Sequence, residues 1–173
     1  MHRVYLGLGS NLGDRRQNIE KAVALIGERV GEVVCRSSLM ETEPWGFESE
    51  NRFLNGVILC ATELSPRKVL VETQQIEREL GRRKKNSPLQ LPQKGEREVL
   101  KSSSPLSTWR GAGGEAPNYH DRPIDIDILL YDDLHIDEPD LTIPHSLMAK
   151  RDFVMQPLAE VKQKMSQKTS QKQ

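Results

Sequence analysis

The chain has 173 residues, and its 25 lysines and arginines are balanced by 25 aspartates and glutamates. A zero net charge argues against a nucleic-acid coat protein or a membrane-surface protein, because both carry an excess of basic residues. The length is that of a single domain, and no apolar run approaches the roughly 18 residues of a membrane span. The apolar stretch at the N-terminus is too short for a secretory signal, so we expect a cytoplasmic protein.

Strand and helix patterns alternate through the first part of the chain. Apolar and polar residues alternate from 3 to 8, which predicts a strand. Asp14 followed by Gln17 is a capping-box pattern, and the apolar residues behind it recur at helical spacing. A second strand is expected at 32–39, and the continuous apolar run at 53–61 predicts a buried strand.

A second helix and a fourth strand complete this pattern. Ser65 before Pro66 predicts a helix N-terminus, and Gly81 predicts the end of that helix. The most regular strand pattern lies at 124–131, and a short helix is expected at 144–150. The order βαββαβ predicts a ferredoxin-like α/β fold, in which an antiparallel sheet is covered by helices on one face.

Other segments depart from this regular pattern. Thirteen of the 33 residues at 86–118 are Gly, Pro or Ser, which indicates a low-complexity loop inserted in a single domain of residues 1–161. We expect residues 82–122 to form a lid over the substrates, because cationic residues stand at both of its ends. A last element is expected at 153–161, and the lack of an apolar period at 162–173 predicts a disordered tail.

Asp125 and Asp127 form the strongest chemical pattern in the sequence. On a strand, residues two apart point to the same face, so these carboxylates are expected side by side. Two such carboxylates repel each other unless a cation lies between them, and Mg²⁺ binds through one or two carboxylates together with waters and phosphates. The alternative is a solvated strand face with two acids. The residues expected to face the core are Ile124, Ile126, Ile128 and Leu130.

Basic residues surround this pair in the sequence. Arg122 precedes the strand, a basic run occupies 82–85, and His145 and Arg151 follow. Cations that face a Mg²⁺–carboxylate site suit a polyphosphate, whose negative charge must be neutralised during transfer. The combination therefore predicts a polyphosphate site, although each basic residue alone is typical of a solvated surface.

Aromatic residues and one amide form a second pattern. Phe53 and Phe153 can sandwich a flat heterocycle, and the Asn55 amide can both donate to and accept from its edge. Trp45 lies in a turn between two predicted strands. The alternative for the aromatic residues is an ordinary place in the core.

Taken together, these motifs resemble the 6-hydroxymethyl-7,8-dihydropterin pyrophosphokinase family. The resemblance implies a ferredoxin-like fold and transfer of diphosphate from ATP to the hydroxymethyl group of the pterin, which yields AMP, in folate biosynthesis. It implies small-molecule partners only, with no nucleic acid and no membrane, and we expect a monomer. The segments that carry the resemblance are GLGSNLGD (7–14), TEPWG (42–46), FLN (53–55), QQIERELGR (74–82), DRPIDIDILLY (121–131) and IPHSLMAKRDFVMQPLAE (143–160).

The resemblance also implies a role for each matching residue. Asp125 and Asp127 would bind two Mg²⁺ and would act in catalysis. The other catalytic residues implied are Arg82 and Arg122. The pterin would be bound by Thr42, Trp45, Phe53, Asn55 and Phe153. The ATP side would be lined by Gln74, Glu77, Lys84, Tyr119, His145 and Arg151, with Glu77 touching the purine or the ribose.

The chain departs from the family pattern in three places. Lys84 stands where an arginine often sits, Tyr119 stands where a tryptophan is common, and the tail at 162–173 replaces ordered sequence. Two other functions fit parts of the pattern. A nucleotidyltransferase would use the paired aspartates but release pyrophosphate, whereas a small-molecule sensor on the same fold would leave the aspartates and arginines unexplained.

Overall fold

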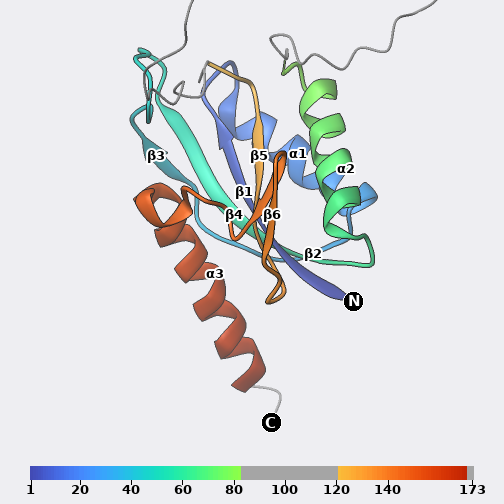
Figure 1. Ribbon diagram of the computed structural model, residues 1–173. Coiled ribbons are helices and arrows are strands. Elements are labelled where there is room, and N and C mark those ends of the chain that lie inside the picture. The colour runs from blue at the N-terminus through green and yellow to red at the C-terminus, as the bar shows by residue number, and fades with distance from the viewer. Residues whose placement is uncertain (83–120, 171–173) are drawn as a thin grey trace, which may run out of the picture.

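The computed structural model describes residues 1–82 and 121–170 (Figure 1). The expected insert at 86–118 and most of the expected lid lie outside these residues. The elements in chain order are β1 (His2–Ser10), α1 (Arg15–Arg29), β2 (Glu32–Arg36), β3 (Met40–Thr42), β4 (Phe53–Thr62), α2 (Pro66–Glu79), β5 (Asp125–Tyr131), β6 (Ile136–Glu138), β7 (Leu141–Ile143), a 3₁₀ turn η1 (Met148–Lys150) and α3 (Asp152–Ser170).

The main sheet has the strand order β2-β4-β1-β5, and all of its pairings are antiparallel. The short strand β3 pairs with the beginning of β4. This arrangement confirms the predicted βαββαβ order and the mixed α/β class. The expected strand at 32–39 is shorter, ending at Arg36, and the hairpin of β6 and β7 was not expected.

The helix boundaries follow the capping residues in the sequence. The Asp14 carboxylate accepts a hydrogen bond from the Gln17 amide at 2.9 Å, which begins α1. Ser65 caps α2 in the same way, with Pro66 in the first turn. Gly81 has a φ of +96°, a conformation that favours glycine, and it follows the end of α2 as predicted.

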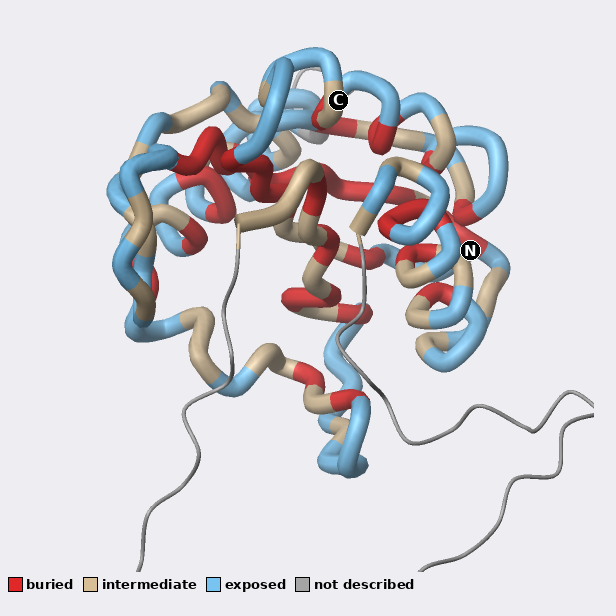
Figure 2. Tube along the Cα trace, turned by 90° about the horizontal axis from the view of Figure 1, so that it is seen from above, coloured by how far each residue is buried: buried red, intermediate tan, exposed pale blue. Residues whose placement is uncertain are grey.

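Helices cover both faces of the sheet, which corrects the expectation of one covered face. Helices α1 and α2 pack on one face, whereas α3 packs on the other, as Figure 1 shows. From α3, Val154, Leu158 and Val161 are buried against Leu59 and Leu129 of the sheet. In Figure 2 the buried segments run through the middle of the molecule, between these layers.

A register shift in β5 changes which residues face the core. Tyr5 pairs with Leu130 and Leu6 pairs with Ile128, so Leu129 is an extra residue on β5. Leu130 was expected to face the core with Ile126, but it lies half-buried on the side of α3. Tyr131 takes its place in the cluster beneath α1 and α2.

The C-terminal segment is helical, so the prediction of a disordered tail at 162–173 is wrong for residues 162–170. Lys164 and Lys168 donate to the carbonyl oxygens of Arg36 and Val34, at 3.0 and 3.3 Å. These bonds hold the last turns of α3 along the edge strand β2. Within the described ranges, neither α3 nor any other helix is long and apolar enough to cross a membrane.

Candidate active site

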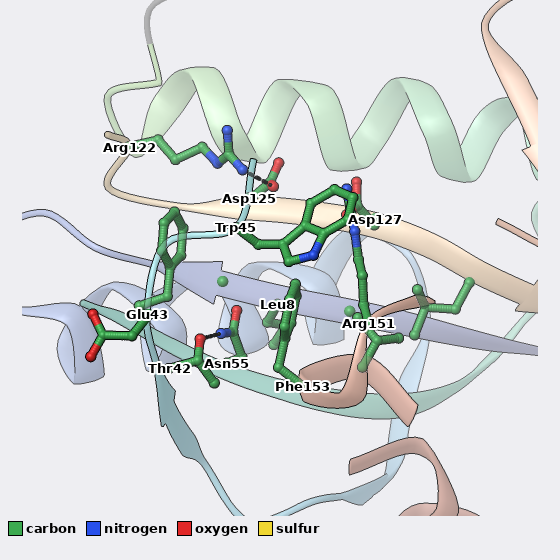
Figure 3. Close-up of a pocket in the computed structure, with 15 residues that line it drawn as sticks. Leu8, Thr42, Glu43, Trp45, Asn55, Arg122, Asp125, Asp127, Arg151 and Phe153 are labelled. Carbon is green, nitrogen blue, oxygen red and sulfur yellow. Dashed lines mark hydrogen bonds and ion pairs between the residues drawn. The ribbon is translucent and has the colours of Figure 1, made fainter. Parts of the chain in front are cut away.

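A pocket opens at one end of the sheet, on the face that α3 covers (Figure 3). Residues from β1, β3, β4 and β5 form its floor and walls, and the first turn of α3 closes one side. The pocket is lined by Gly7, Leu8, Gly9, Thr42, Glu43, Trp45, Phe53, Asn55, Arg122, Asp125, Asp127, Leu129, Arg151, Phe153 and Val154.

Two glycines of β1 make the floor of this pocket. Gly9 pairs with Asn55 of β4 on one side and with Asp125 of β5 on the other. A Cβ atom at Gly9 would lie 2.9 Å from the Asn55 side-chain oxygen, and one at Gly7 would lie 3.4 Å from Leu129. Glycine at these positions therefore leaves room for side chains from both neighbouring strands to meet over β1.

Asp125 and Asp127 lie on the pocket face of β5, as their spacing predicted. The two carboxylate oxygens of Asp125 pair with Arg82 Nη1 at 2.6 Å and Arg122 Nη2 at 2.9 Å. Asp127 Oδ2 lies 3.8 Å from Arg151 Nη1. Three arginines from different parts of the chain therefore converge on two carboxylates.

The donor set of this pair suits a magnesium ion. Burial and then the neighbouring Asp125 carboxylate raise the pKa of Asp127, Arg151 opposes the rise, and the resulting pKa is about 7. A cation between the carboxylates would relieve that repulsion. Among the described residues no cluster of three acidic, His or Cys side chains could hold a metal, and Mg²⁺ characteristically takes few carboxylates and completes its shell with water and phosphate oxygens.

Glu77 reaches from α2 to the backbone of β5. Its side chain is buried, with only 4% of the residue exposed. The carboxylate accepts a 2.7 Å hydrogen bond from the Ile126 amide and pairs with Arg82. Burial raises the pKa of Glu77 to about 7, while Arg82 opposes the rise. Glu77 thus fastens Arg82 and β5 from beneath, and its expected contact with a purine or a ribose stays a prediction.

The five residues expected to bind the pterin all line the pocket. The Asn55 amide donates to the Thr42 hydroxyl at 2.8 Å, as the dashed line in Figure 3 shows. The Arg122 guanidinium lies 5.4 Å from the centre of the Phe53 ring. The Arg151 guanidinium lies 4.6 Å from the centre of the Trp45 ring and 5.9 Å from that of Phe153.

Other expected ATP-side residues lie away from this pocket or outside the described chain. Gln74 is half-buried on α2, one helical turn before Glu77. His145 accepts a hydrogen bond from the Leu147 amide at its Nδ1. Burial lowers the pKa of His145, and the positive charge of Arg151 lowers it as well. Lys84 and Tyr119 lie outside the described residues.

The sequence analysis did not single out Glu43, which lines the pocket mouth. Its carboxylate pairs with Arg52 at 2.8 Å. Because Arg52 directly precedes β4, this pair ties the two ends of the 43–52 loop together. Glu43 is the second residue of the TEPWG segment, and this position was the sequence feature that could have indicated a place in the site.

A solved structure supports the fold. The chain is similar to a crystal structure of a Plasmodium falciparum HPPK-DHPS triple mutant, with a TM-score of 0.57. The sequences are 16% identical, and the match covers 92% of this chain and 40% of that chain. At that identity the likeness bears on the fold alone.

Sequence comparisons identify the family. The family model described as 7,8-dihydro-6-hydroxymethylpterin-pyrophosphokinase matches residues 5–99 and 103–163. A Porphyromonas gingivalis protein named 2-amino-4-hydroxy-6-hydroxymethyldihydropteridine pyrophosphokinase is 43% identical over 159 residues, 91% of this chain and 89% of that protein. A protein of the same name from Aquifex aeolicus is 35% identical, over 93% of this chain and 81% of its own. The resemblance seen in the sequence is confirmed, and the chain belongs to the 7,8-dihydro-6-hydroxymethylpterin-pyrophosphokinase family.

Proposed function

We propose that this protein transfers a diphosphate group from ATP to the hydroxymethyl oxygen of 6-hydroxymethyl-7,8-dihydropterin and releases AMP. The activity matches the family description and the names of the relatives, and a Schizosaccharomyces pombe relative that is 34% identical over 89% of this chain is named as a folic acid synthesis protein. The observation that carries the proposal is the position of Gly9. It is paired with Asn55 on one side and with Asp125 on the other, so a polar heterocycle site and a polyphosphate site meet across one strand.

The heterocycle side of the pocket has the chemistry that a pterin needs. A pterin edge has both hydrogen-bond donors and acceptors, and an amide such as that of Asn55 can accept from the donors and donate to the acceptors. Asn55 is 8% exposed and is held by Thr42, so its orientation is fixed before a ligand arrives. Phe53 and Phe153 border the same space and supply apolar faces for the ring.

The phosphate side supplies charge of both signs. Asp125 and Asp127 would hold Mg²⁺, which when bound neutralises phosphate charge and orients the transferred group. We propose that each site binds two Mg²⁺ ions and that ATP oxygens would complete their coordination. With the two carboxylates holding the metal, Arg82, Arg122 and Arg151 would bind the phosphate oxygens, for which guanidinium groups are well suited.

The transfer needs little covalent chemistry from the protein. The pterin hydroxymethyl oxygen bonds to the β-phosphorus of ATP and its proton passes to solvent, while the bond from that phosphorus to the α,β-bridging oxygen breaks. AMP leaves with the bridging oxygen. The residues on the pocket walls bind, orient and stabilise charge, which is the main work of catalysis in phosphoryl transfer.

The product assay tests this function. With ATP, Mg²⁺ and the reduced hydroxymethylpterin, we expect AMP and the pterin diphosphate in a one-to-one ratio. Free pyrophosphate as the main product would instead indicate nucleotidyl transfer. Tight pterin binding without any turnover of ATP would indicate a sensor.

A further inference from the structure

Three segments of the chain meet at one carboxylate beside the pocket. Asp121 Oδ1 accepts a hydrogen bond from Asn11 Nδ2 at 2.6 Å, and Asp121 Oδ2 accepts one from Asn51 Nδ2 at 2.7 Å. Asn11 directly follows β1, Asn51 lies in the 43–52 loop two residues before β4, and Asp121 precedes β5 by four residues. Hydrogen bonds from Ser49 and then from the two amides lower the pKa of Asp121.

The same contact fixes the backbone of the next residue. The Arg122 amide donates to Asn11 Oδ1 at 2.7 Å, and the Asn11 amide donates to the Arg122 carbonyl at 3.1 Å. Asn11 is 3% exposed, so it is a rigid anchor at the end of β1. The chain is thus pinned immediately before the Arg122 side chain enters the pocket.

Arg122 has two neighbours whose distances depend on that anchor. Its guanidinium pairs with Asp125 at 2.9 Å and lies 5.4 Å from the Phe53 ring centre. Phe53 follows Asn51 by two residues, so one carboxylate holds both the loop that leads to Phe53 and the backbone of Arg122. A shift of either segment would change where the guanidinium lies between the heterocycle side and the phosphate side.

We propose that Asp121 is a positioning residue that couples the 43–52 loop to Arg122. Through Asn51 it ties the wall that carries Trp45 to the backbone of the arginine. A pterin that settles against this wall thereby favours the placement of Arg122 required for transfer. This inference rests on the proposed function, since it assigns the clamp a role in the joint use of the two substrates.

An exchange of partners tests the clamp without removing its atoms. Asn51→Asp places two carboxylates against each other and should open the contact. The double variant Asn51→Asp with Asp121→Asn restores both hydrogen bonds, because the new amide accepts from Asn11 and donates to the new carboxylate. We expect Asn51→Asp to lower kcat/KM for the pterin roughly tenfold, in the range that a misplaced group costs, and the double variant to recover most of it.

Asp132→Asn is the matched control. Asp132 also accepts two hydrogen bonds, from His2 and from the Arg3 amide, but it lies outside the pocket. We expect its kinetics to equal those of the wild type. Binding of a non-hydrolysable ATP analogue with Mg²⁺ should weaken less than kcat/KM for the pterin falls, because Arg82 and Arg151 keep their places, so most of the loss should fall on the pterin and on kcat.

The outcomes separate the clamp from the proposed function. If the wild type itself forms no AMP, the proposed function is wrong. If the wild type is active and Asn51→Asp matches it, or lowers only the melting temperature, the clamp has no role in positioning. If the double variant stays as impaired as Asn51→Asp, the contact between these two side chains is not the cause.

Discussion

The amide of Ile126 in β5 donates a 2.7 Å hydrogen bond to the carboxylate of Glu77 on α2. Ile126 lies between Asp125 and Asp127, so a helix on one face of the sheet holds the strand whose other face carries the acidic pair. The same carboxylate pairs with Arg82, which reaches Asp125. Glu77 therefore supports both the strand and the arginine at the site.

Glu77→Ala should lower both stability and turnover. It leaves the buried Ile126 amide without its acceptor, which costs on the order of 1–3 kcal/mol, and it frees Arg82 to move. Urea unfolding and the AMP assay measure the two effects, and Glu77→Gln, which keeps an acceptor, should be less destabilised. The control is Glu79→Ala on the same helix, which removes an exposed ion pair with Arg29 of α1 and should change stability by less than about 1 kcal/mol. Equal unfolding curves for the Glu77→Ala and Glu79→Ala variants would contradict this role.

The local parts of the fold could be predicted from the sequence. Asp14 and Ser65 cap helices because their side chains bond to amides a few residues away, and such contacts depend on local sequence alone. The extra residue at Leu129 depends on how β5 meets β1, which no periodicity records. The last turns of α3 depend on lysines that reach the carbonyls of β2, so a polar segment became a helix through tertiary contacts.

The sequence also predicted part of the site. Strand alternation placed Asp125 and Asp127 on one face, and the family motifs gave the pocket residues. The burial of Glu77 had a signal that was not used, because it lies four residues after Thr73 on the buried stripe of α2. Its pairing with Arg82 had no such signal, because it depends on how the chain turns after Gly81.

The acidic pair should reduce the stability of the metal-free protein as pH rises. The pKa of Asp127 is raised to about 7 in the folded protein, from roughly 4 in an unfolded chain. Between these values the folded state holds more protons than the unfolded state, so the free energy of unfolding falls as pH increases from about 4 to 7. Asp127→Asn removes this effect. We expect the Asp127→Asn variant to gain stability relative to the wild type across that window and to keep a constant advantage above pH 8.

Urea unfolding at several pH values in the presence of a chelator measures this difference. Asp14→Asn, at the N-terminus of α1 and outside the pocket, serves as the control for the loss of one carboxylate. An advantage of Asp127→Asn that does not grow between pH 5 and pH 7 would show that Asp127 is ionised as easily as an ordinary aspartate.

Bound magnesium should reverse the order of stability. In the presence of Mg²⁺ and a non-hydrolysable ATP analogue, the wild type should melt at a higher temperature, because a ligand that binds the folded state stabilises it. Asp125→Asn and Asp127→Asn should lose most of this increase and should also lose at least a hundredfold in kcat, as expected when a metal ligand is removed. A chelator should abolish the increase in the wild type. An unchanged increase in both variants would exclude a metal role for the pair.

Gly9 in the floor of the pocket is crowded, whereas Gly27 in α1 is not, so alanine at the two positions should have different effects. A Cβ atom at Gly9 would meet the Asn55 oxygen at 2.9 Å, whereas one at Gly27 in α1 would meet nothing within 4 Å. Gly9→Ala should therefore push the Asn55 amide away from Thr42 and raise KM for the pterin by roughly tenfold, the effect of losing a well-placed hydrogen bond. Gly27→Ala should stabilise α1 by about 0.5–1 kcal/mol and leave the kinetics unchanged. Steady-state kinetics and urea unfolding of the two variants measure this contrast. If Gly9→Ala binds the pterin as the wild type does, Asn55 does not read its edge from the position that β1 leaves open.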